Sequence, residues 1–201
     1  IGKAAGDAIT SGTKNVLIGH EAGSAIQDDD NNTALGYNAL KAATAGDANT
    51  AIGSLAMGLG AVTGSSNTAI GYAAGYDLTS GDSNVMVGRD AGGNATTGKQ
   101  NVIIGLDACG LGVLANASST EGMYNVVVGP QAGYDLTSGE SNILIGKDAG
   151  ANMTNNGSNI AIGHGALDAA VAAEHFNLAI GTNALSTENS NAAYCIAIGP
   201  S

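Results

Sequence analysis

The sequence of 201 residues contains no tryptophan, one phenylalanine, two prolines and only six lysines and arginines. Ordinary globular cores are built around large aromatic and leucine side chains, so the scarcity of aromatics argues against such a core. Seventeen aspartates and glutamates give a net charge of −11, which disfavours nucleic acid and anionic membranes as partners. No apolar run approaches the ~20 residues that span a bilayer, so we expect no membrane insertion in this segment.

Glycine and small or β-branched apolar residues dominate instead. The chain has 32 glycines, and 44% of its residues are hydrophobic, which is too many for a disordered chain. Alanine, valine and isoleucine suit a thin, tightly stacked β structure better than a spherical core.

An apolar residue followed by glycine recurs every 17 or 18 residues, with one interval of 24 between Gly105 and Gly129. We call these residues the coil glycines: Gly2, Gly19, Gly36, Gly53, Gly71, Gly88, Gly105, Gly129, Gly146, Gly163, Gly181 and Gly199. The segment 74–92 returns almost unchanged at 132–150. So short a unit buries an apolar face only by stacking on its neighbours, about 4.8 Å apart. The repeat predicts an all-β fold, a parallel β-roll or β-solenoid of about twelve 17–18-residue coils. We expect one domain over 1–201, part of a longer fibre, with an insertion loop at 106–128.

Two other columns of the repeat carry structural information. Alanine follows every coil glycine by three residues wherever the sequence continues, which indicates a sterically tight position. The coil glycine itself indicates either a positive φ or a backbone approach too close for a Cβ. Asparagine precedes the coil glycine by four residues, and stacked amides can hydrogen-bond into a ladder. The predicted structural ladder is Asn15, Asn32, Asn49, Asn67, Asn84, Asn101, Asn125, Asn142, Asn159 and Asn177.

The three residues before many coil glycines are all apolar, as in 102–104 and 143–145. Alternate residues of a strand face opposite sides, and a strand that is apolar on both faces is covered on both. We expect the middle residue to face outward against sister chains. The predicted trimer interface is Leu17, Met86, Ile103, Val127 and Leu144. A monomeric solenoid whose stripe is covered by its own loops is the alternative, and the pattern does not separate three chains from two.

The segments 49–53 (NTAIG), 67–72 (NTAIGY) and 34–40 (ALGYNAL) resemble the NTAIGYxAL repeats of phage tail fibres. They are also similar to the SVAIG repeats in the YadA-type heads of trimeric autotransporter adhesins. The resemblance implies a left-handed, homotrimeric parallel β-roll on a virion tail fibre or a bacterial cell surface, with an adhesive or receptor-binding function. The coil is longer than that of the YadA-type head, so a triangular coil and a roll with longer loops both remain open.

The function expected is therefore a non-catalytic, structural or adhesive fibre segment that mediates attachment to a host or target cell, without cofactor, catalytic residues or metal ligands. A cell-surface glycan or protein receptor is the expected partner. Tyrosines that can stack on sugar rings form the candidate ligand surface: Tyr37, Tyr72, Tyr76, Tyr124 and Tyr134. One alternative is a tailspike-like depolymerase that cleaves carbohydrate. An ice- or lattice-binding solenoid is another, but it requires paired threonine rows, and only Thr33, Thr50 and Thr68 align.

Three segments have weaker chemical signals. Residues 28–32 (DDDNN) offer oxygen ligands for calcium, although a solvated acidic turn explains them better. Asp90 and Asp107 share a column on adjacent coils, at a spacing that resembles a retaining glycosidase pair, but the column varies freely elsewhere. Residues 93–100 (GNATTGKQ) lack the final serine or threonine of a phosphate-binding loop.

The two cysteines, Cys109 and Cys195, lie five coils apart. Five coils correspond to about 24 Å along the axis, whereas a disulfide requires Cα atoms within about 7 Å. We therefore expect both to be small fillers of the core, with a cross-chain disulfide as the alternative. His20, His164 and His175 are scattered and form no ligand set with metal-like spacing.

Overall fold

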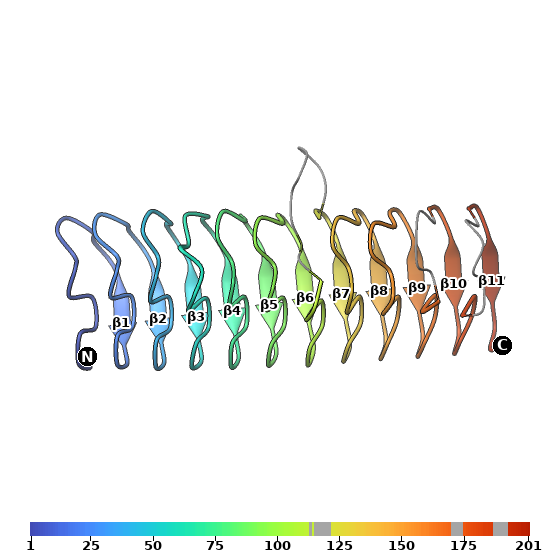
Figure 1. The fold of residues 1–201 in the computed structure, drawn as a ribbon, viewed down its shortest axis with the longest axis horizontal. Helices are drawn as coiled ribbons and strands as arrows, with labels where there is room; N and C mark the ends of the chain where they lie inside the picture. The colour runs from blue at the N-terminus through green and yellow to red at the C-terminus, as the bar shows by residue number, and fades with distance from the viewer. Residues whose placement is uncertain (113, 115–121, 170–174, 187–192) are drawn as a thin grey trace.

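In the computed structural model, each coil contributes one three-residue strand, and the strands lie side by side along the axis of a rod (Figure 1). The structure describes residues 1–112, 114, 122–169, 175–186 and 193–201. The strands are β1 (Val16–Ile18), β2 (Thr33–Leu35), β3 (Thr50–Ile52), β4 (Thr68–Ile70), β5 (Val85–Val87), β6 (Val102–Ile104), β7 (Val126–Val128), β8 (Ile143–Ile145), β9 (Ile160–Ile162), β10 (Leu178–Ile180) and β11 (Ile196–Ile198). They form one parallel sheet in chain order, so the predicted all-β parallel solenoid is confirmed. Eleven strands accompany twelve coil glycines because Gly2 follows only Ile1.

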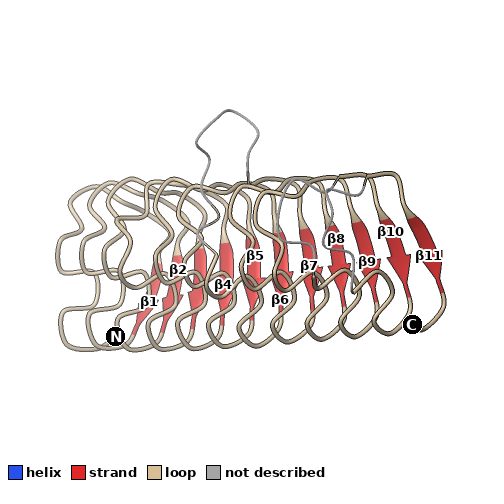
Figure 2. Cartoon of the chain, turned by 45° about the vertical axis from the view of Figure 1, so that its right-hand side comes forward, coloured by secondary structure: helices blue, strands red, loops and turns tan. Residues whose placement is uncertain are grey.

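The strand register joins the same column in every coil. Val102 pairs with Val126 and Ile103 with Val127, although this coil has 24 residues. The extra residues therefore leave the sheet undisturbed. Within the expected insertion loop at 106–128, residues 113 and 115–121 lie outside the described part of the chain. Figure 2 shows all the strands on one side of the rod, with turns forming the rest of each coil.

The coil glycines end the strands for both of the reasons that the sequence left open. All twelve have φ between +127° and +147°, a region that side chains disfavour. All of them except Gly199 also lie directly against the next coil. A Cβ built on Gly105 would approach the carbonyl oxygen of Gly129 at 2.5 Å. Each strand is therefore limited to three residues, and the chain turns at the same point in every coil.

The middle residue of each strand points into the coil, not outward, which corrects the predicted trimer interface. Met86, Val127 and Leu144 are fully buried within a single chain, and Ile103 is 1% exposed. Leu17, in the first strand, packs against the same core. The reason lies in the asparagine column, because each asparagine precedes the middle residue by two positions. The two therefore share a face, and the ladder asparagines are buried except for Asn15 in the first coil.

The first and third residues of the strands point outward and form what we call the sheet face. Nineteen of its 22 positions are valine, isoleucine or leucine, and the other three are threonine. Ile104 and Ile145, in the middle of the sheet, are each 37% exposed. The strands are thus apolar on both faces, as the sequence indicated, but with the two faces exchanged.

The remaining core is built from the alanine column and a few larger side chains in the turns. Leu40, Met57 and Cys109 occupy one inward column, and all three have positive φ. Among the described residues, 26 non-glycine residues have positive φ, which costs about 1–2 kcal/mol per residue in L-amino acids. Hydrogen bonds between stacked coils must offset this backbone strain.

Candidate functional site

The asparagines form a buried ladder that fixes how each coil lies on the next. The Oδ1 atom of Asn67 accepts the backbone N–H of Asn84 at 3.0 Å. The Nδ2 group of Asn84 donates to Asn67 Oδ1 at 3.0 Å and to the carbonyl of Gly98 at 2.8 Å. Backbone N–H to Oδ1 bonds of this kind, at 2.8–3.1 Å, join neighbouring coils along the rod as far as Cys195, which occupies the asparagine position of the last coil. Turn residues of equivalent columns are therefore held in register from coil to coil.

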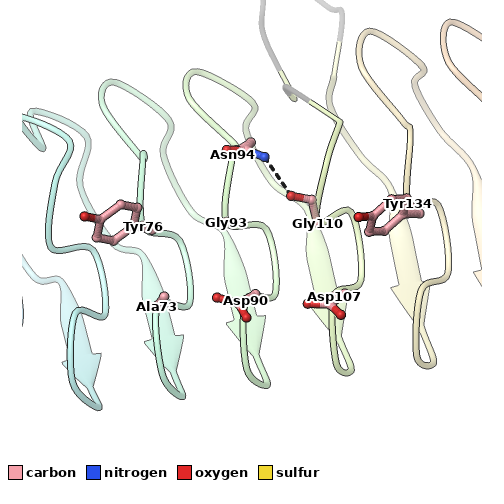
Figure 3. Close-up of a pocket in the computed structure, with 8 residues that line it drawn as sticks. All are labelled: Ala73, Tyr76, Asp90, Gly93, Asn94, Asp107, Gly110 and Tyr134. Atoms are coloured by element: carbon pink, nitrogen blue, oxygen red, sulfur yellow. Dashed lines mark hydrogen bonds between the residues drawn. The ribbon is translucent and has the colours of Figure 1, made fainter.

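One hollow of about 250 Å³ opens on this framework, across the turns that follow β4 to β7 (Figure 3). We call it the tyrosine hollow, and its lining residues are Ala73, Tyr76, Asp90, Gly93, Asn94, Asp107, Gly110 and Tyr134. Two columns create it. The fifth residue after the coil glycine is tyrosine, glycine, glycine and tyrosine in four successive coils, namely Tyr76, Gly93, Gly110 and Tyr134. The two glycines have no side chains, so space opens between the two rings.

The second column supplies the polar edge of the hollow. It contains Ala73, Asp90 and Asp107, each two residues after its coil glycine. In Figure 3 the two carboxylates lie side by side below the glycines, with a tyrosine at each end. Asn94, which follows Gly93, completes the lining. Its Nδ2 group donates a hydrogen bond to the carbonyl of Gly110 at 2.7 Å and so lies across from one coil to the next.

The two carboxylates differ in their partners. The Nε group of Arg89 lies 2.9 Å from Asp90 Oδ2, in an ion pair whose arginine is well exposed. The carboxylate of Asp107 makes no hydrogen bond or ion pair with any residue that the structure describes. The hollow thus presents one uncommitted carboxylate, one paired carboxylate and two aromatic rings.

Only two of the five tyrosines of the predicted ligand surface meet at the hollow. Tyr37 and Tyr72 directly follow coil glycines and are half exposed in a different column, where Tyr37 stacks on His20 with ring centroids 5.4 Å apart. Tyr124 precedes the ladder residue Asn125 and is also half exposed. The lining residues that sequence reasoning did not connect with the tyrosines or the aspartates are Ala73, the two glycines and Asn94. Two glycines between two tyrosines in one column is the signal that would have found them.

The acidic turn at 28–32 does not gather its oxygens around a common point. Asp28 accepts hydrogen bonds from the hydroxyls of Thr10 and Ser11, and these bonds lower the pKa of its carboxyl. Asp30 accepts the hydroxyl and backbone N–H of Thr13, which likewise lowers its pKa. Across the described part of the chain, no three histidine, cysteine or acidic side chains are placed to hold a metal ion.

Of the remaining sequence candidates, only the segment 93–100 contributes to the hollow, through Gly93 and Asn94. Cys109 is fully buried, and burial raises the pKa of its thiol to about 12, whereas Cys195 is partly exposed. Both are free thiols. The segment 93–100 runs through turns of the repeat, and no helix follows it among the described residues. His164 lies 3.5 Å from Asp148, whereas Nδ1 of His175 accepts the backbone N–H of Gly157 at 3.0 Å and His20 stacks on Tyr37, so the three histidines have different partners.

No protein-family model matches the chain, and no curated protein or solved structure matches it significantly. Within the described ranges, the structure contains no helix long and apolar enough to cross a membrane. The fold and the surfaces of the chain itself are therefore the basis for inferring its function.

Proposed function

We propose that this chain is a non-catalytic segment of a homotrimeric extracellular fibre, a phage tail fibre or bacterial surface adhesin, that attaches to a host or target cell. The single observation that carries the proposal is the sheet face. It extends over eleven strands without a charged residue. At about 4.8 Å per strand, the face is roughly 50 Å long and presents several hundred Å² of apolar surface.

An apolar surface of this length calls for a partner. Soluble monomers rarely expose so large a contiguous apolar patch, and such patches mark interaction sites. The first and third strand residues repeat with every coil, so a matching partner needs the same axial period over the whole length. A second copy of this chain has the same axial period, because it has the same coils. Burying each exposed aliphatic side chain further stabilises the assembly, because burial contributes about 25 cal/mol per Å².

The number of chains and the attachment role rest on the resemblance to fibre repeats. The segments 49–53 and 67–72 lie on strands β3 and β4 and the residues flanking them, so the resembling motifs are the ones that build the sheet face. Three copies arranged around a common axis bury three such faces together. A shaft of this kind holds the turns of each coil outward, where a target surface is accessible to them.

Solution mass tests the fibre proposal directly. Light scattering should give about three times the 19.5 kDa of one chain. Ile104→Lys places a charge in the middle of the sheet face and should shift the mass towards that of a single chain. Leu106→Lys is the matched control, since Leu106 is 45% exposed in a turn outside the sheet face, and it should leave the mass unchanged. A monomeric wild-type chain would remove the main support for the fibre.

A second candidate function, carbohydrate cleavage, is favoured by one observation: Asp90 and Asp107 lie on adjacent coils within one hollow. The coil spacing of about 4.8 Å is close to the separation of about 5–5.5 Å between the carboxyl groups of retaining glycosidases. Release of reducing sugar from a polysaccharide, abolished in Asp107→Asn, would favour this candidate over the non-catalytic one. We expect no release.

A further inference from the structure

We propose that the tyrosine hollow binds a short stretch of neutral saccharide, about two sugar rings long. The proposal names the target class for the attachment function above and rests on that function for its biological role. The hollow spans four coils, so its end walls are three coil spacings, or about 14 Å, apart. The space between these walls is long enough for about two sugar rings.

The end walls suit the faces of sugar rings. Tyr76 and Tyr134 are both partly buried and lie at the two ends of the hollow (Figure 3). A pyranose has an apolar face of C–H groups that packs against an aromatic ring, while its hydroxyls point sideways to polar partners. Partly buried rings also lose less conformational entropy on binding than fully exposed ones.

The edge of the hollow suits hydroxyl groups. An ionised carboxylate only accepts hydrogen bonds, and its two oxygens can take two neighbouring hydroxyls of one sugar. Asp107 is free to do so, since its carboxylate is bonded to none of the described residues. Gly93 and Gly110 leave backbone exposed where a side chain would otherwise block the sugar.

The charge of the site excludes several other ligands. Two carboxylates within a chain of net charge −11 disfavour phosphate, sulfate and uronic acids. Few apolar side chains line the hollow, which disfavours a lipid tail. A basic peptide would pair with the carboxylates but would make little use of two tyrosines so far apart, so it serves as a competing outcome of the test.

The two tyrosines come from the two copies of the duplicated segment, 74–92 and 132–150. These copies lie three coils apart, and the two coils between them have glycine at the tyrosine position. The hollow is therefore a local departure from the repeat. In a homotrimer it would occur three times, so weak individual sites would reinforce one another through multivalency.

The variants that test the proposal change residues of the hollow and leave every asparagine of the ladder in place. Tyr134→Ala removes one wall. Gly93→Tyr fills the space, and the fold has room for it: a Cβ built on Gly93 meets no atom closer than 3.3 Å, and the same column already contains Tyr76 and Tyr134. Tyr72→Ala is the matched control, because Tyr72 is half exposed and outside the hollow. The thermal midpoint of each variant confirms that it is folded.

Binding is measured by calorimetry with maltotetraose, cellotetraose, chitotetraose and mannotetraose, and with tetragalacturonate and tetralysine for comparison. We expect at least one neutral tetrasaccharide to bind, roughly tenfold more weakly in Tyr134→Ala, as loss of an aromatic contact implies. Binding should be undetectable in Gly93→Tyr and unchanged in Tyr72→Ala. The proposal is overturned if no neutral tetrasaccharide binds, if Gly93→Tyr binds normally, or if tetralysine or tetragalacturonate binds more tightly than all four.

The same samples separate this proposal from the fibre proposal. Their solution mass is measured by light scattering before each titration. A trimer that binds no neutral saccharide overturns the saccharide site and leaves the fibre proposal standing. A monomer that binds saccharide in the hollow overturns the fibre and leaves the site standing.

Discussion

The side-chain oxygen of Asn101 accepts two hydrogen bonds from Asn125, one from its backbone N–H at 2.9 Å and one from its Nδ2 group at 3.0 Å. Twenty-four residues separate the pair, yet the same bonds join Asn84 to Asn101 across 17 residues. The ladder therefore fixes the stacking of coils independently of coil length. Extra residues are accommodated between ladder positions, so the long coil, which contributes Asp107 and Gly110 to the hollow, stacks in the same register as its neighbours.

Asn125→Ala should destabilise the rod strongly. The Nδ2 group of Asn125 also donates to the carbonyl of Gly139 at 2.9 Å, and its Oδ1 atom accepts from the N–H of Asn142 at 3.1 Å. Removing the amide leaves both buried groups unpaired, at about 1–3 kcal/mol each. We expect a loss of about 2–5 kcal/mol in the free energy of unfolding, measured by guanidinium denaturation.

The matched control for the ladder is Asn152→Ala. Asn152 is exposed, and its amide donates to the carbonyl of Asp168 at the surface, so its loss should cost less than about 1 kcal/mol. Equal effects of the two substitutions would show that the ladder does not hold the coils together.

The repeat in the sequence was sufficient to predict the parallel stack, the ladder and the turning point at each coil glycine. It did not reveal which way the strands face, because the apolar triplets look alike from either side. The buried position of Ile103 follows from Asn101, two residues earlier on the same face. If the asparagines lie in the core, the middle residue of each strand must face the core as well. The first and third residues of each strand then face outward and form the sheet face.

The left-handed backbone of the turns could not be predicted from residue type. Leu40 and Met57 have φ of 51° and 47°, a conformation that isolated leucine and methionine avoid. They adopt it because stacked coils must present the same turn to the next coil. The tyrosines were candidate binding residues from the outset. That Tyr76 and Tyr134 line one hollow could not be predicted from the tyrosines themselves. It depends on Gly93 and Gly110, which have no side chains to fill the space between the two rings.

Gly105→Ala should be far more damaging than Gly93→Ala. Gly105 has φ of 140°, and an added Cβ would meet the carbonyl oxygen of Gly129 at 2.5 Å. Backbone strain alone costs about 1–3 kcal/mol, and the clash adds to it, so we expect a loss of more than about 3 kcal/mol. At Gly93 the nearest atom is 3.3 Å away, and the change should stay within about 1 kcal/mol. Similar thermal midpoints for the two variants would contradict the close stacking of the coil glycines.

Asp29→Asn should stabilise the protein at neutral pH. Burial, followed by the charges of Asp47 and Asp28, raises the pKa of Asp29, so its ionisation opposes folding above that pKa. The gain should shrink as pH falls from the folded pKa towards the unfolded value of 3.8, and it should disappear below that value, where both states are protonated. Asn156 occupies the same column and is fully buried, which shows that the site accepts an amide.

Asp30→Asn is the control for Asp29→Asn, because its expected effect on stability has the opposite sign. Hydrogen bonds from Thr13 lower the pKa of Asp30, so its carboxylate stabilises the fold above its unfolded pKa, and that contribution is lost as pH falls through the folded pKa. This substitution should therefore lower the thermal midpoint at pH 7. Thermal midpoints of both variants and the wild type between pH 3 and pH 7 test the two signs together. A gain for Asp29→Asn that persists at pH 3 would show that charge is not its cause.

The two thiols should differ sharply in reactivity. Only a thiolate attacks a disulfide reagent, and Cys109 is fully buried with its pKa raised to about 12. Its column neighbours on the adjacent coils are Gly92 and Gly133, so its small side chain is enclosed by backbone and core. Cys195 is partly exposed. We expect an aromatic disulfide reagent at pH 8 to modify one thiol per folded chain and two in guanidinium. In Cys195→Ser the folded chain should not react, and rapid modification of Cys109 there would mean that its coil opens far more readily than the continuous ladder implies.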